Sequence, residues 1–185
     1  MKLVRNNFFI LTGGPGSGKT TLIEILRARG YACVEEAARK IIQQQVKFGG
    51  DAVHWKDQIK FRELMLSWCV DAFENVIERV RPVFFDRGIP ELIGYSAMIN
   101  AENPSYIQRA ADIFRYNPMV FVAPPWKEIY RNDEERKQSF EEAIDSYLAT
   151  IRCYEKCGYS LVELPKVSPI ERGDFLLKRI QSAAS

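Results

Sequence analysis

The run Gly13–Thr20, which reads Gly-Gly-Pro-Gly-Ser-Gly-Lys-Thr, constrains the fold of this 185-residue chain more than any other feature. It matches the pattern G-x-x-x-x-G-K-[ST] at every fixed position, follows the apolar run Phe8–Thr12 and precedes a helical pattern. The apolar run predicts a buried strand, because it continues without interruption to the glycines. A strand, a glycine-rich turn and a helix in this order indicate a P-loop, and a chance glycine-rich turn is the alternative.

The residue types in this run suit a phosphate group. Glycines let successive backbone N–H groups face an anion, and the start of the following helix adds its dipole. Lys19 would reach the β- and γ-phosphates of a nucleoside triphosphate, and the Thr20 hydroxyl would ligate Mg²⁺. The sequence lacks an N-K-x-D guanine-reading motif, which favours ATP over GTP. The residues expected to bind ATP here are Gly13, Gly14, Pro15, Gly16, Ser17, Gly18, Lys19, Thr20 and Thr21.

Composition excludes several classes of protein. Apolar residues make up 46% and charged residues 27% of the chain, so we expect one globular domain over residues 1–185. No segment approaches the ~20 apolar residues of a membrane span, and the net charge of +2 argues against nucleic acid as a partner. The N-terminus lacks a signal-peptide pattern, and four scattered cysteines fit reduced thiols. We therefore expect a cytoplasmic protein.

Short apolar runs alternate with helical patterns along the chain, which is typical of a parallel α/β sheet. Strands are predicted at residues 8–12, 31–34, 82–85, 119–123 and 159–164. Helices are predicted from residue 19 to Gly30, at 37–45, 54–80, 90–99, 105–114 and 139–157, and from the capping signal Ser168–Glu171 onward. The predicted fold is an α/β three-layer sandwich with a five-stranded parallel sheet.

Charged residues follow two predicted strands at their carboxyl ends, where ligands bind in sheets of this type. Glu35 and Glu36 follow the second strand, and Asp86 and Arg87 follow the third. Asp86 is the candidate for holding Mg²⁺ through water, and Arg87 places a second cation near the phosphates. Motor-type and AAA+ ATPases carry a water-activating glutamate where this chain has Arg87. The pair therefore favours phosphoryl transfer over hydrolysis, with a structural pair that caps the next helix as the alternative.

Beyond the P-loop, the chain resembles a family of P-loop ATPases and kinases related to the ribosylnicotinamide kinase domain of NadR. It is also similar to nucleoside and thymidylate kinases, which carry an acidic residue and arginine at the end of the third strand. The matching stretches are Glu36–Arg39, Phe85–Gly88, Pro124–Tyr130 and Asp133–Arg136. The resemblance implies a nucleoside-kinase-like fold and transfer of the ATP γ-phosphate to a small, nucleoside-like acceptor. An ATPase or a nucleotide-dependent switch without such an acceptor is the alternative.

The resemblance also implies roles for particular residues. Glu36 matches the acidic residue that acts as base on the attacking hydroxyl, while Glu35 is its neighbour and the sequence leaves open which one faces the site. Helix capping by both glutamates is the alternative. Residues 126–138 lie where related kinases carry a lid, so Arg136 and then Arg131 are expected to close over the triphosphate. A solvated charged helix face is the alternative for this segment.

An adenine-binding loop and an acceptor pocket are also expected. Lys166 lies in the loop that holds adenine through backbone contacts in related kinases. Trp55 and Trp68 are expected to pack in the core or at the surface and to form no ligand platform. The acceptor pocket is expected from Gln58, Phe61, Arg62 and Tyr95, with core packing as the alternative, which is favoured for Phe61.

Overall fold

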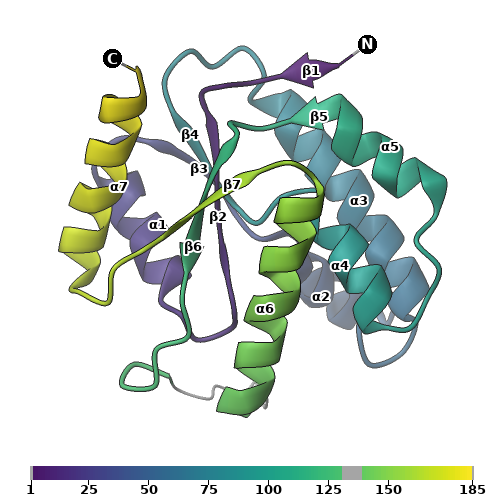
Figure 1. Ribbon diagram of the computed structural model, residues 1–185. Helices are drawn as coiled ribbons and strands as arrows, with labels where there is room; N and C mark the ends of the chain where they lie inside the picture. The colour runs from purple at the N-terminus through teal and green to yellow at the C-terminus, as the bar shows by residue number, and fades with distance from the viewer. Residues whose placement is uncertain (1, 131–138, 185) are drawn as a thin grey trace.

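The computed structural model describes residues 2–130 and 139–184, and at its centre lies a five-stranded parallel sheet (Figure 1). The strands lie in the order β3–β4–β2–β6–β7, and each neighbouring pair is parallel. The first of these strands along the chain, β2, is therefore central, and the P-loop begins at its carboxyl end. The bounds are β2 (Phe8–Gly13), β3 (Ala32–Val34), β4 (Val83–Asp86), β6 (Met119–Ala123) and β7 (Ser160–Glu163).

Helices cover both faces of this sheet, so the predicted three-layer α/β sandwich is confirmed. Figure 1 shows α1 and α7 side by side on one face, and α3, α4 and α6 on the other. The bounds are α1 (Lys19–Ala28), α2 (Ala37–Phe48), α3 (Gln58–Asn75), α4 (Glu91–Met98), α5 (Ser105–Ile113), α6 (Phe140–Lys156) and α7 (Pro169–Ala184). Within residues 2–130 and 139–184, none of the helices has the length and apolar character of a membrane span.

The central strand β2 divides the core into two parts. Phe8 and Ile10 pack in a cluster with residues of α3 and α6, whereas Phe9 and Leu11 pack in a cluster with residues of α1 and α7. Successive side chains of a strand point to opposite faces, and both faces are covered here. Every residue of β2 is therefore buried, as its uninterrupted apolar run predicts.

The predicted helix over residues 54–80 is wrong at both ends, because α3 spans only Gln58–Asn75. Asp57 caps α3, since its carboxylate accepts a hydrogen bond from the Lys60 N–H at 2.9 Å. The capping signal at Ser168 is confirmed: the Ser168 hydroxyl accepts from the Glu171 N–H, and the Glu171 carboxylate accepts from the Ser168 N–H.

The structure contains a small second sheet that the sequence analysis did not predict. The strands β1 (Leu3–Val4) and β5 (Phe114–Arg115) pair in parallel, although Phe114 was expected to end a helix. Two-residue strands are too short to show the alternation by which strands are recognised. The four cysteines are all free thiols, in agreement with the predicted reduced state.

Candidate functional site

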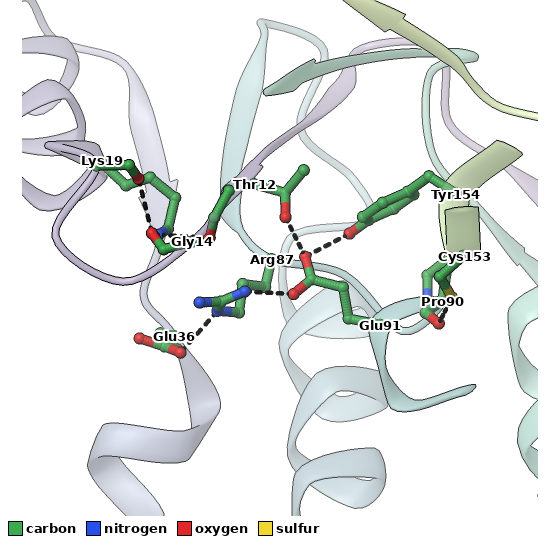
Figure 2. A network of polar contacts seen from close by, with 11 residues as sticks. Thr12, Gly14, Lys19, Glu36, Arg87, Pro90, Glu91, Cys153 and Tyr154 are labelled. Atoms are coloured by element: carbon green, nitrogen blue, oxygen red, sulfur yellow. Dashed lines mark hydrogen bonds and ion pairs between the residues drawn. The ribbon is translucent and has the colours of Figure 1, made fainter. Parts of the chain in front are cut away.

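The P-loop joins β2 to α1 and presents the start of that helix to the site. Gly18 occupies the N-cap position in the left-handed conformation, with φ 83°, and its lack of a side chain leaves the first N–H groups of α1 uncapped. Lys19 folds back over the loop, and its Nζ donates to the carbonyl oxygens of Gly13 and Gly14, both at 3.0 Å (Figure 2). These features suit an anion at the start of α1.

Lys19 is buried, and burial acts with the charge of Arg87 to lower the pKa of its ammonium to about 8. The carboxylates of Asp86, Glu36 and Glu91 act in the opposite direction. The nearby carboxylates do not fully compensate the Lys19 ammonium for its lost hydration, so a further anion would stabilise its charged form. Bound phosphate would therefore stabilise the charged form of Lys19.

Asp86, at the end of β4, fits the residue that would help to hold Mg²⁺. Its Oδ1 is buried and accepts no hydrogen bond among the described residues. Burial raises the pKa of this carboxyl, against the effect of Lys19. The described residues contain no group of three or more candidate ligands, so phosphate oxygens and water would have to complete the shell, as Mg²⁺ prefers. Thr20 and Thr21 lie exposed in the first turn of α1.

Arg87 joins two glutamates, Glu36 and Glu91, in the polar network of Figure 2. Its backbone has φ 72°, a conformation that few residues other than glycine adopt, and its N–H donates to the Leu11 carbonyl at 2.9 Å. Its guanidinium donates from Nε to Glu36 Oε1 at 2.7 Å and from Nη1 to Glu91 Oε2 at 2.5 Å. Burial opposes the charge, yet Glu91 and Glu36 raise the pKa of Arg87 well above its usual value.

The two neighbouring glutamates after β3 have different surroundings. Glu36 occupies the N-cap position of α2 but makes no side-chain capping hydrogen bond, and its carboxylate contacts Arg87. Glu35 is half exposed and forms ion pairs with Arg27 at 3.2 Å and Lys40 at 3.0 Å. The structure thus brings Glu36 together with Arg87, while Glu35 binds cations of α1 and α2.

Glu91, the first residue of α4, is a site residue that sequence reasoning missed. In addition to Arg87, it accepts hydrogen bonds on Oε1 from the Thr12 hydroxyl at 2.6 Å and the Tyr154 hydroxyl at 2.8 Å. In the sequence, Glu91 resembles any acidic residue in the first turn of a helix. Its spacing of four residues from Arg87 was the one available signal.

Arg172 of α7 was also missed. It is almost fully buried and donates from Nη1 to the Ser17 carbonyl and from Nε to the Pro165 carbonyl, both at 2.8 Å. Its guanidinium carbon lies 4.9 Å from the centre of the Trp126 ring. Arg172 thus connects the P-loop to the loop that precedes α7. An arginine near a helix start opposes the helix dipole, which was a weak signal of another role.

A cavity of about 1210 Å³ opens beside this network. Pro15 of the P-loop lines it together with Glu36, Asp86, Arg87 and Glu91, and most of the remaining wall comes from α2, α3, α4, α6 and the segment that precedes α3. The volume is large enough for a small-molecule ligand. Its position places such a ligand next to the charged groups at the ends of β3 and β4.

The aromatic wall of the cavity agrees in part with the sequence prediction. Gln58, Phe61 and Tyr95 line the cavity, and the Tyr95 hydroxyl is buried without a hydrogen-bond partner among the described residues. Arg62 was wrongly placed there: it is buried and donates to Ser96 Oγ and to the Glu102 carbonyl, both at 3.0 Å. It ties α3 to α4 and to the loop after it.

The two tryptophans expected to serve only in packing line this cavity as well. Trp55 and Trp68 both contribute to its wall, together with His54. The indole of Trp55 is about half exposed, at 54%, and the His54 ring meets it edge-on with centroids 4.6 Å apart. Large aromatic surfaces around a cavity offer stacking and apolar contact to a planar ligand.

The predicted lid falls largely outside the described residues. Arg131 and Arg136 both belong to residues 131–138, so their roles stay predictions. Within the described residues of the predicted lid, the Tyr130 ring packs against Gly16. A Cβ added to Gly16 would lie 2.7 Å from the Tyr130 ring. The Tyr130 hydroxyl donates to the Ser139 carbonyl at 3.2 Å. Lys166 is exposed in the loop between β7 and α7, and its backbone contact with adenine also stays a prediction.

Three solved structures share this fold. A deoxyadenosine kinase from M. mycoides, solved with dCMP and dCDP, has a TM-score of 0.65 at 16% identity, covering 95% of this chain and 99% of its own. A thymidylate kinase from Ehrlichia chaffeensis has a TM-score of 0.59 at 16% identity, covering 96% and 100%. A shikimate kinase from Acinetobacter baumannii, in complex with shikimate, has a TM-score of 0.55 at 13% identity, covering 95% and 93%. The common feature is the fold of P-loop small-molecule kinases.

Sequence comparison identifies the family more directly. No curated protein matches the chain. A family model described as an AAA domain matches residues 8–172, which include the P-loop, the Asp86–Arg87 pair and the arginine that contacts Ser17. This chain therefore belongs to that family of AAA domains, within a fold that it shares with nucleoside and shikimate kinases.

Proposed function

We propose that this protein is a kinase that transfers the γ-phosphoryl group of ATP to a hydroxyl of a small, nucleoside-like acceptor. The observation that carries the proposal is the cavity, because one wall joins the P-loop to Glu36 and Arg87 and the other is aromatic. A protein that only hydrolyses ATP, or only switches between nucleotide states, has no need of a ligand-sized cavity at this place.

The transfer step requires an in-line attack by the acceptor hydroxyl. The acceptor oxygen bonds to the γ-phosphorus, the bond to the bridging oxygen breaks to release ADP, and the hydroxyl proton passes to the Glu36 carboxylate. Lys19 and Arg87 contribute positive charge next to the phosphoryl oxygens. Thr20 and Asp86 would hold Mg²⁺, which would neutralise further phosphate charge.

The charges around the cavity narrow the class of acceptor. Its described lining has five carboxylates against two arginines: Glu35, Glu36, Asp86, Glu91 and Glu142 against Arg39 and Arg87. Arg87 is already paired with two of these carboxylates. A phosphate or carboxylate on the acceptor would meet repulsion there. The charges therefore favour an acceptor without an anionic group, such as a nucleoside, over a nucleotide or an acid such as shikimate.

The aromatic wall supports a planar group on the acceptor. Phe61 and Tyr95 meet edge-on with ring centroids 6.0 Å apart, and Trp55 and Trp68 add further aromatic surface. The buried Tyr95 hydroxyl, which has no hydrogen-bond partner within residues 2–130 and 139–184, would gain one from a heteroatom of the ligand. Burial raises the pKa of Tyr95 to about 12, so this hydroxyl stays protonated and can donate.

The test is a screen for ADP production that depends on the acceptor. Purified protein with MgATP is offered nucleosides, the matching nucleoside 5′-monophosphates and shikimate, and products are identified by mass spectrometry. At least one nucleoside is expected to stimulate ADP formation and to gain one phosphoryl group, while its monophosphate does not. ADP formation at the same rate without any acceptor would favour the ATPase, and use of an anionic acceptor would refute the charge argument.

A further inference from the structure

Three side chains of the protein donate hydrogen bonds to the carboxylate of Glu91. Its Oε2 accepts from Arg87, and its Oε1 accepts from Thr12 and from Tyr154. A carboxylate offers about four lone-pair positions, and three of them have donors here. The positions of the Arg87, Thr12 and Tyr154 donor groups are therefore linked through this one carboxylate.

The two hydroxyl donors come from different elements and belong to buried residues. Thr12 ends the apolar run of β2, and Tyr154 lies on α6, each with 0% exposed surface. Buried hydroxyls need partners, and these two share one carboxylate oxygen. Next to Tyr154, the Cys153 thiol donates to the Pro90 carbonyl at 2.8 Å, so α6 contacts the start of α4 twice (Figure 2).

We propose that Glu91 is a positioning residue, which holds the Arg87 guanidinium in the orientation that presents Nε to Glu36. The inference rests on the proposed phosphoryl transfer, because it assigns Arg87 and Glu36 to that reaction. Arg87 follows a strand in a strained backbone conformation and has a long side chain, so without Glu91 its guanidinium would be held from one side only. Charge-assisted hydrogen bonds in a low-dielectric site fix such geometry strongly.

The hydrogen bonds of Glu91 and Arg87 connect four elements, β2, α2, α4 and α6. Tyr154 of α6 and Thr12 of β2 orient Glu91 of α4, and Glu91 orients Arg87, which contacts Glu36 at the start of α2. Thr12, Tyr154 and the segment that carries both Arg87 and Glu91 are far apart in the chain, so their common geometry exists only in the folded site. A shift of α6 would therefore reach Arg87 through a single carboxylate.

The first test is a double-mutant cycle on transfer. Glu91→Gln keeps the size of the side chain but removes its charge, and we expect at least a tenfold lower kcat with KM for ATP changed less than threefold. In the Arg87→Ala background the same substitution is expected to change kcat less than threefold, because Glu91 acts through Arg87. Equal losses in both backgrounds would overturn the proposal.

A second variant separates positioning from general stability. Tyr154→Phe removes one hydroxyl that binds Glu91, and Tyr147→Phe, on the same helix, removes one that binds the Glu163 carboxylate at 2.7 Å instead. We expect similar small changes in Tm for both, but a lower kcat for Tyr154→Phe alone. If kcat falls equally in both, Glu91 has no positioning role.

A readout without acceptor distinguishes failure of this inference from failure of the proposed function. The Nε–H signal of Arg87 in ¹⁵N NMR, assigned by its loss in Arg87→Lys, reports the hydrogen bond to Glu36. Faster exchange of this proton with water is expected in Glu91→Gln and not in Tyr147→Phe. An unchanged exchange rate in Glu91→Gln refutes the positioning role, even if the wild-type protein proves not to be a kinase.

Discussion

Raising the pH from 7.5 to 9.5 acts directly on Lys19, because burial, assisted by the charge of Arg87, lowers the pKa of its ammonium to about 8. Below this pH the free protein already carries the positive charge on Lys19 that we expect to contact phosphate. Above it, Lys19 is neutral and must take up a proton when nucleotide binds, since phosphate stabilises the charged form. Nucleotide affinity is therefore expected to be greatest below pH 8 and to fall as the pH rises.

The size of the loss in nucleotide affinity follows from the lowered pKa of Lys19. If the pKa in the complex returns to its ordinary value of 10.5 or above, the affinity falls by the factor 1 + 10^(pH − 8) relative to the fully protonated protein. This gives roughly a tenfold loss by pH 9 and roughly a thirtyfold loss by pH 9.5. The phosphate groups of the nucleotide stay fully ionised between pH 7.5 and 9.5, so they add no pH dependence of their own.

Calorimetry measures both the affinity and the proton uptake. MgADP is titrated into the protein at four pH values between 7.5 and 9.5, in pairs of buffers that differ in ionisation enthalpy. Proton uptake is expected to rise from roughly a quarter of a proton per site at pH 7.5 toward one per site at pH 9.5 as affinity falls. Lys19→Arg is the matched control, because the guanidinium stays charged and should abolish the pH dependence whatever its own affinity. A flat profile in the wild type, or a slope that persists in Lys19→Arg, would refute the reasoning.

Three other substitutions test separate parts of the site. Glu36→Gln is expected to cut transfer by ~10²-fold or more with ATP affinity retained. Glu35→Gln, which removes a half-exposed carboxylate paired with Arg27 and Lys40, should leave turnover unchanged, and equal effects would exclude Glu36 as base. Asp86→Asn should raise the Mg²⁺ concentration for half-maximal activity without lowering Tm, and an unaltered Mg²⁺ titration would contradict its role. Gly16→Ala should weaken MgADP binding, measured by calorimetry, because φ is 69° and the new Cβ would lie 2.7 Å from the Tyr130 ring; undiminished affinity would show that the loop tolerates the strain.

Local patterns in the sequence predicted most of the fold. The P-loop is recognisable because its residues are contiguous, and the strands because helices cover both faces and leave uninterrupted apolar runs. The start of α7 was visible in four consecutive residues, Ser168–Glu171. In contrast, periodicity alone extended α3 past the Asp57 cap, since apolar spacing carries no information about where a helix stops.

The site was less predictable, because its contacts join residues far apart in the chain. Glu91 meets Thr12 over a separation of 79 residues and Tyr154 over 63, and no local pattern specifies either contact. Glu35 and Glu36 are identical in type and adjacent, yet only the direction in which β3 delivers the chain decides which one contacts Arg87. Two-fold alternation predicts opposite directions for the pair but not which direction leads inward.

The hydrogen bond between Arg172 and Ser17 has a consequence for how the protein is made. The two residues are 155 positions apart, so at typical rates of synthesis of about 5–20 residues/s the P-loop leaves the ribosome roughly 8 to 30 s before its partner. During that interval the nascent loop has every residue of its motif but lacks the arginine that holds the Ser17 carbonyl. We therefore expect shortened chains that end before residue 172 to bind nucleotide more weakly than the full chain, although they contain the whole motif.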